Sequence, residues 1–176
     1  MPHPPGKPLG CRPHRVTDSA GYLAGLWSIE RVVIDRRTET EGSFRGSAEF
    51  RAADAAGVAG AAEAAEAAEA AGAPERALLH REEGQLTWGG RTYPATRVLR
   101  LLPRPDGTAE VTFADGRHFH ELDLRSGDWS VVHLCAADRY EGRFTVCSPD
   151  EWHLQWRITG PAKDQLLQSV YRRRVP

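Results

Sequence analysis

The sequence lacks several features that would assign the protein to a common class. No apolar run approaches the roughly 20 residues that a membrane-spanning helix requires. Basic residues are not in excess, because 23 lysines and arginines stand against 24 aspartates and glutamates. Proteins that bind nucleic acid or a membrane surface normally carry such an excess. We therefore expect neither nucleic acid nor a membrane as a partner.

Cysteine is scarce and odd in number. Cys11, Cys135 and Cys147 lie far apart in the sequence, which is not the pattern of a disulfide framework. The simplest interpretation is three reduced thiols, with Cys11 and Cys147 incidental to function. The N-terminus also lacks the apolar core of a secretory signal. Together these features predict a cytoplasmic protein.

Two stretches are poor in residues that could form a core. Residues 1–20 contain five prolines and few apolar residues, which predicts a disordered tail. Residues 52–75 carry an Ala-Ala-Glu repeat without Leu, Ile or Phe, which predicts a solvated, partly helical loop insertion. A partner-binding helix is the alternative for this insertion. The remainder of residues 21–176 is expected to form one domain.

The rest of the chain divides into short β-type segments separated by turn residues. Parallel sheets need crossover helices, and no amphipathic helix lies between these segments, so the sheet should be antiparallel. Closure removes the vulnerable edges of such a large sheet. We therefore predict an all-β fold, a closed antiparallel up-and-down β-barrel of about ten strands. The predicted strands are Leu26–Ile34, Ser43–Phe50, Leu78–Trp88, Arg91–Leu102, Ala109–Phe113, Arg117–Leu124, Trp129–Cys135, Arg139–Cys147, Glu151–Ile158 and Gln165–Arg173.

The two ends of this strand set carry a known signature. Gly25-Leu26-Trp27 opens the first strand, and Tyr171-Arg172-Arg173 closes the last. This pattern resembles that of the calycins, which include lipocalins and fatty-acid-binding proteins. The resemblance implies that a late arginine, Arg172 or Arg173, stacks on the Trp27 indole and seals one end of the barrel.

A longer resemblance covers Leu23–Arg174. Its characteristic motifs are DGRHFH (residues 115–120), HLCAADRY (133–140) and GPAKD (160–164). Over this span the chain is similar to an uncharacterised bacterial and fungal domain family of unknown function. The resemblance implies a fold and a set of motifs, and no activity. The Ala-rich insertion is the main departure from the family pattern.

Strand alternation places several polar side chains on inferred inward faces, where a plain barrel core would be apolar. Such groups need partners when buried, so they are either satisfied core hydrogen bonds, for example Arg31 to a carboxylate or His120 to Asp138, or the lining of a ligand cavity. The concentration of these groups favours a protein that binds a small molecule with a polar or acidic group. The predicted ligand-binding residues are Trp27, Arg31, Arg97, His120, His133, Cys135, Asp138, Tyr140, Trp156 and Lys163.

Two other functions remain open at this point. His118, His120, His133 and Cys135 are candidate ligands of a metal ion or haem, because His-x-His and His-x-Cys spacings place each pair on one face of a strand. An enzyme of the cyclase, isomerase or hydrolase type would use His120, His133 and Tyr140 as acid–base groups. Lys163 either belongs to an ordinary turn or attracts an anionic ligand to the barrel mouth. The sequence predicts neither the identity of a cofactor nor the oligomeric state.

Overall fold

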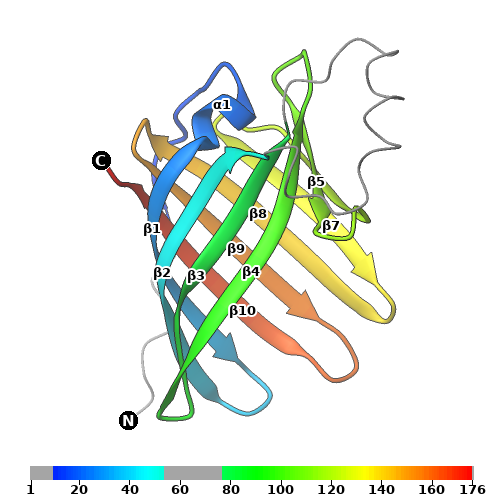
Figure 1. Ribbon diagram of the computed structural model, residues 1–176. Helices are drawn as coiled ribbons and strands as arrows, with labels where there is room; N and C mark the ends of the chain where they lie inside the picture. The colour runs from blue at the N-terminus through cyan, green and yellow to red at the C-terminus, as the bar shows by residue number, and fades with distance from the viewer. Residues whose placement is uncertain (1–9, 54–76, 176) are drawn as a thin grey trace.

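The computed structural model describes residues 10–53 and 77–175. They form one antiparallel sheet that curls into a nearly closed barrel, with a short helix at one end (Figure 1). The all-β prediction is thereby confirmed. The elements are α1 (Ser19–Leu23), β1 (Gly25–Asp35), β2 (Thr40–Ala52), β3 (Leu78–Trp88), β4 (Arg91–Pro103), β5 (Ala109–Phe113), β6 (His118–Leu122), β7 (Asp128–Cys135), β8 (Asp138–Ser148), β9 (Glu151–Thr159) and β10 (Asp164–Arg173).

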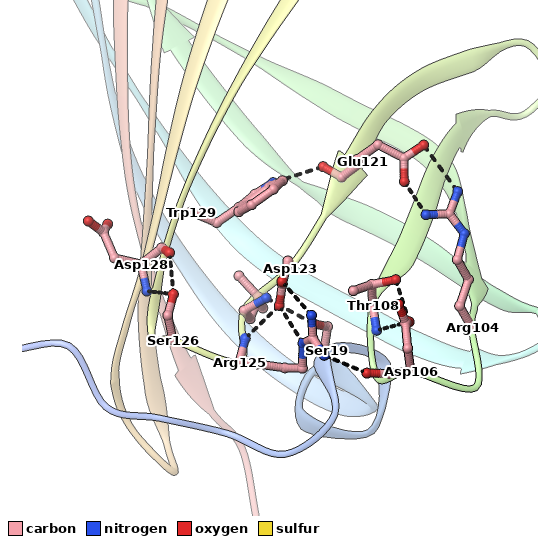
Figure 2. Close-up of polar contacts among 11 residues, drawn as sticks. Ser19, Arg104, Asp106, Thr108, Glu121, Asp123, Arg125, Ser126, Asp128 and Trp129 are labelled. Carbon is pink, nitrogen blue, oxygen red and sulfur yellow. Dashed lines mark hydrogen bonds and ion pairs between the residues drawn. The ribbon is translucent and has the colours of Figure 1, made fainter.

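The strand order is that of an up-and-down barrel. The sheet runs β6-β5-β4-β3-β2-β1-β10-β9-β8-β7, so the first and last strands of the chain pair with each other. The two sheet edges are β6 and β7, which follow one another in the sequence. A side chain bridges them, because the Trp129 indole Nε1 on β7 donates a hydrogen bond of 3.0 Å to the Glu121 carbonyl on β6 (Figure 2).

The closed end of the barrel is built around Trp27. The side chain of Asp18 caps α1 by accepting hydrogen bonds from the Ala20 and Gly21 amides. The Trp27 indole is fully buried and donates to the Leu23 carbonyl at 2.8 Å. The Arg173 guanidinium lies 4.1 Å from the indole centroid. The arginine expected over Trp27 is therefore present, and it is Arg173.

Aromatic packing fills the half of the barrel next to α1. The rings of Trp152 and Tyr171 stack with centroids 3.7 Å apart, and Trp27 meets Trp152 edge to face at 6.3 Å. Phe50 and Phe144 pack against the same tryptophan. This half is a densely packed core.

The segment before α1 differs from the sequence prediction. Residues 10–18, here called the strap, lie against β8. The His14 amide donates a hydrogen bond of 2.8 Å to the Val146 carbonyl. Ser19 is buried, donates from its amide to the Gly107 carbonyl and accepts from the Leu124 amide. The prediction of disorder is therefore wrong for residues 10–20, because contacts with distant strands order a segment that has little apolar surface of its own.

The cysteine prediction is also corrected. Cys11 on the strap and Cys147 on β8 form a disulfide across a sequence separation of 136 residues, whereas Cys135 is a free, exposed thiol. The long separation concealed this pair in the sequence. Most of the Ala-rich insertion predicted at 52–75 lies outside the described residues. Within the described part of the chain, no helix is long and apolar enough to cross a membrane.

Candidate functional site

A cavity of about 420 Å³ occupies the half of the barrel away from the aromatic core. Its rim on β4 is left open because β5 pairs only with Leu99–Pro103, so the earlier part of β4 pairs with β3 alone. The lining combines apolar side chains with a small charged group. The cavity is lined by Arg31, Val33, Phe44, Glu82, Leu86, Trp88, Ala95, Thr96, Arg97, Gln165 and Leu167.

Glu82 on β3 forms the charged floor of this cavity. Its carboxylate is 2% exposed and accepts hydrogen bonds from Arg31 Nη2 at 3.0 Å and from Arg97 Nη2 at 2.8 Å. The Tyr171 hydroxyl donates a further bond of 2.7 Å. Arg31 is itself held in place, because its Nε donates to Ser169 Oγ at 2.7 Å. The carboxylate is therefore fixed by donors from three other strands, β1, β4 and β10.

These contacts decide the charge states. Burial raises the pKa of the Glu82 carboxyl, but the attraction of Arg97 and Arg31 outweighs it and holds that pKa well below its usual range. Burial likewise lowers the pKa of Arg31, and Tyr171 and Glu82 reverse that effect, so the guanidinium stays charged. His80, two residues before Glu82, is buried, and burial lowers its pKa. The group thus holds one anion, two cations and a neutral imidazole, with a net charge of +1.

Arg97 is the cation best placed to meet a ligand. Its side chain is 36% exposed, against 12% for Arg31. It also lies at the boundary of the two halves, since it lines both the large cavity and a void of about 30 Å³ in the core. Its Nε is buried and has no hydrogen-bond partner among the described residues. The floor therefore presents a guanidinium whose donors are only partly used by Glu82.

The predicted site residues fall into separate regions. Arg31 and Arg97 line the large cavity. Trp27 and Trp156 are core residues, and Trp156 stacks on Phe119 at 5.4 Å. The buried His120 lines the small core void and hydrogen-bonds through Nδ1 to the Glu121 carbonyl at 2.8 Å. It does not bond to Asp138, as one interpretation of the sequence expected.

The prediction that His118 and His120 share a face is wrong. A β-bulge at Val111/Thr112 places Phe119 as an extra residue, and its ring turns inward against Phe113 and His133. His118 is exposed and pairs with Glu110 at 2.9 Å. A metal site needs several ligand atoms close together. Among the described residues, no three of His118, His120, His133 and Cys135 bring their ligand atoms within 4.8 Å of one another.

The remaining candidates lie near the β7–β8 turn. Cys135 is exposed, and the half-buried His133 contacts the aromatic rings of Phe113, Phe119 and Tyr140. Lys163 pairs with Asp138 at 2.6 Å and donates to the Tyr140 hydroxyl at 3.2 Å. The hydrogen bonds that Lys163 donates to Asp138 and Tyr140 raise its pKa. Catalysis or haem binding by His120, His133, Cys135 or Tyr140 stays a prediction.

Sequence reasoning missed the centre of the site. Glu82, His80, Tyr171 and Ser169 did not appear among the candidates. One signal was available, because alternation along Leu78–Trp88 places His80, Glu82 and Leu86 on one face. A carboxylate on this largely apolar face needs a cationic partner when it is buried. Glu82 is therefore a predictable partner for Arg31, which lies on another inferred inward face. Which arginines complete that partner depends on strand register.

Comparison with known proteins adds a family and a fold. The sequence model of one family, described as "Family of unknown function (DUF6314)", matches residues 23–173. No curated protein matches the chain. Among solved structures, the S-type phycobiliprotein lyase CPES from Guillardia theta is similar, with 12% identity and a TM-score of 0.60 over 89% of this chain and 91% of the lyase. At this identity the similarity concerns the fold alone.

Two engineered barrels are more distantly similar. A de novo designed fluorescence-activating β-barrel shares 17% identity at a TM-score of 0.43, over 90% of this chain and 100% of the design. The redesigned barrel mFAP0, solved bound to DFHBI, shares 13% identity at a TM-score of 0.41, over 86% of this chain and 99% of that barrel.

Proposed function

The chain belongs to DUF6314, a family of unknown function, and on that premise we propose that it binds a small organic molecule inside its barrel. The ligand has an apolar body and one anionic group. The body lies among the apolar side chains of the large cavity, and the anionic group meets Arg97 on its floor.

The size and lining of the cavity support an organic ligand. A volume of about 420 Å³ falls within the range of roughly 300–1,000 Å³ that is typical of small-molecule pockets. Val33, Leu86 and Leu167 supply apolar contacts, and Phe44 and Trp88 add aromatic rings. Such a pocket removes apolar ligand surface from water, and each Å² removed contributes about 25 cal/mol.

The charge balance at Glu82 carries the proposal of an anionic group. One carboxylate faces two guanidiniums there, and Arg97 remains over a third exposed with Nε unpartnered among the described residues. A carboxylate, sulfonate or phosphate at this position would neutralise the excess positive charge. It would also accept charge-assisted hydrogen bonds in a partly buried setting, where they are stronger than in water.

A matched pair of dyes tests this proposal. 8-Anilinonaphthalene-1-sulfonate and N-phenyl-1-naphthylamine have the same aromatic body and differ by the sulfonate. We expect the protein to bind the sulfonate more tightly. Arg97→Met should weaken sulfonate binding by roughly 10- to 100-fold, the value of a charge-assisted hydrogen bond, and leave the neutral dye nearly unchanged.

Arg100→Met is the matched control, because Arg100 lies on the same strand and is absent from the cavity lining. It should leave the binding of both dyes unchanged. Equal weakening of both dyes by Arg97→Met, or no preference for the sulfonate in the unaltered protein, would overturn the proposed anionic group. Failure of both dyes to bind in stoichiometric amounts would argue against the cavity as a ligand site.

A further inference from the structure

A second cluster of reactive side chains lies away from the cavity, where the strap crosses β8 and β9. Cys11 is on the strap, Cys147 is on β8 and His153 is on β9. One potential ligand atom from each of the three lies within 4.8 Å of the other two. The sulfur atoms form a disulfide in this structure. Three chain segments thus bring two sulfurs and an imidazole to one point.

His153 occupies an unusual environment. It alternates with the inward-facing Trp152 and Leu154 along β9, yet it is 9% exposed. Its Nε2 lies 2.8 Å from Glu151 Oε1, whereas its Nδ1 is buried without a hydrogen-bond partner among the described residues. A buried polar atom without a partner costs free energy, so it calls for an explanation. With Nε2 held by a carboxylate, Nδ1 is the nitrogen left to coordinate an ion.

Glu151 supports this arrangement. Its other oxygen accepts a hydrogen bond from Arg172 Nε at 3.0 Å. The carboxylate is thereby held between Arg172 and His153 and orients the imidazole. Histidines that bind metal ions commonly donate their second ring N–H to a carboxylate in this way.

We propose that the reduced form of this cluster binds one zinc ion through the Cys11 and Cys147 thiolates and the His153 imidazole. Two thiolates and one imidazole form a donor set that Zn²⁺ prefers, and a water molecule completes the tetrahedron. Donor atoms on a tetrahedral zinc ion lie about 3.3–3.8 Å apart, given bonds of roughly 2.0–2.3 Å. On reduction the two sulfurs move apart from their bonded positions, and the imidazole nitrogen, already within 4.8 Å of both, needs only a small approach.

The change between the two forms balances chemically. A dithiol reductant of the thioredoxin class gives two electrons and two protons to the Cys11–Cys147 disulfide. The S–S bond breaks, two thiols form, and the reductant becomes a disulfide. Zn²⁺ then replaces the two thiol protons, which are released to solvent, and two Zn–S bonds form.

We expect the strap to stay attached to β8 in both the oxidised and the reduced protein. The disulfide fastens Cys11 to β8 when the protein is oxidised, and zinc fastens the same residue when it is reduced. Because the strap leads directly into α1, this clasp also anchors the helix at the closed end of the barrel (Figure 1). The site is independent of the cavity, so either proposal can fail without the other.

Cobalt titration of the full-length protein tests the proposal. The chain is reduced with dithiothreitol, freed of reductant by anaerobic gel filtration and titrated with Co²⁺, which replaces zinc and reports its coordination by absorbance. We expect one Co²⁺ per reduced chain, with the intense d–d bands of a tetrahedral ion and thiolate-to-cobalt charge-transfer absorption. Zn²⁺ should displace the cobalt. The same polypeptide with its disulfide intact should show none of these bands.

Variants assign the ligands. Cys147→Ser and His153→Ala should abolish or strongly weaken binding, and Glu151→Gln should weaken it roughly 10- to 100-fold. Cys135→Ser is the matched control, because it removes the third, exposed thiol and should leave binding intact. Circular dichroism confirms that each variant keeps the barrel. Absent cobalt binding in the reduced protein, binding without charge-transfer absorption, or loss of binding in Cys135→Ser would each overturn the proposal.

Discussion

Glu82 and Arg31 face each other inside the barrel, with Arg31 Nη2 at 3.0 Å from both carboxylate oxygens and the two side chains only 2% and 12% exposed. Such a pair carries a large desolvation cost, so it is stable only because further hydrogen bonds complete it. Tyr171 donates such a bond to Glu82, and Ser169 Oγ accepts one from Arg31 Nε. The same group separates the aromatic core from the cavity, which makes it both a structural element and the floor of the proposed binding site.

Removing the charge of Glu82 should destabilise the fold. Glu82→Gln leaves Arg31 and Arg97 without their carboxylate, and breaking a buried pair in this way costs about 3–5 kcal/mol. Urea denaturation measures the change in the free energy of unfolding. Glu83→Gln is the control, because the neighbouring Glu83 is 61% exposed and pairs only with Arg81 among the described residues; its effect should stay within about 0.5 kcal/mol. Similar effects from both variants would contradict a structural role of the buried pair.

His120 should make stability depend on pH. Burial lowers the pKa of His120 to about 4, from 6.5 for a free histidine. Between these values the unfolded chain binds more protons than the folded one, so stability is complete above pH 6.5 and falls as the pH drops toward 4. The contribution is roughly 3 kcal/mol. Glu82 acts in a lower window, since its depressed pKa costs stability only below its unfolded value of about 4.5.

His120→Phe isolates this effect. The ring keeps its aromatic neighbours Phe119, Phe144 and Trp156 but no longer titrates. Denaturation midpoints measured between about pH 4 and pH 7 should vary less in this variant than in the unaltered protein. His118→Gln, at an exposed position, should retain the full slope. An unchanged slope in His120→Phe would show that other groups carry the dependence.

The seam between β6 and β7 should open when its bridge is removed. Trp129→Phe loses the hydrogen bond from the indole Nε1 to the Glu121 carbonyl, which is worth about 0.5–1.5 kcal/mol. We expect faster amide hydrogen exchange in β5 and β6, the short hairpin that this bond holds. The amides of β1 and β2, in the continuous part of the sheet, serve as the internal reference. Equal acceleration in both regions would indicate global destabilisation instead of a local opening.

The two adjacent arginines at the end of β10 should differ sharply. Arg173 covers Trp27 and donates to the Ala24 and Tyr22 carbonyls, so Arg173→Ala should cost at least about 2 kcal/mol. Arg172 is half exposed and forms surface ion pairs, so Arg172→Ala should cost less than about 1 kcal/mol. Thermal melting curves of the two variants compare them directly. A larger loss for Arg172→Ala would contradict the sealing role of Arg173.

Local sequence patterns predicted the strands closely, because the period-2 alternation and the turn residues act over a few neighbours. The predicted segments Leu78–Trp88 and Ala109–Phe113 coincide with β3 and β5. Local alternation failed at Phe119, where the bulge changes which side chains face inward. A bulge depends on the partner strand, and a single strand's sequence does not contain that information.

The candidate site was predicted only in part. Arg31 and Arg97 lie on inward faces as predicted, and Arg31 meets the carboxylate of Glu82, as the interpretation of a satisfied core hydrogen bond had it. The prediction of His133, Cys135 and Tyr140 rested on strand alternation, which places them on inferred inward faces. The cavity is instead built by β1, β2, β3, β4 and β10, whose residues converge only after the sheet has closed.

By itself the sequence determined that this protein is an antiparallel barrel, where its strands lie and that an arginine near the C-terminus seals Trp27, because each of these follows from alternation, turns or a compact signature. Only the tertiary structure decided that Glu82 lies between Arg31 and Arg97 and that Cys11 meets Cys147 and His153. The first outcome depends on strand register, and the second depends on where the strap lies against the barrel. Register is set by the packing of the whole barrel, so it is not encoded in any one stretch of residues.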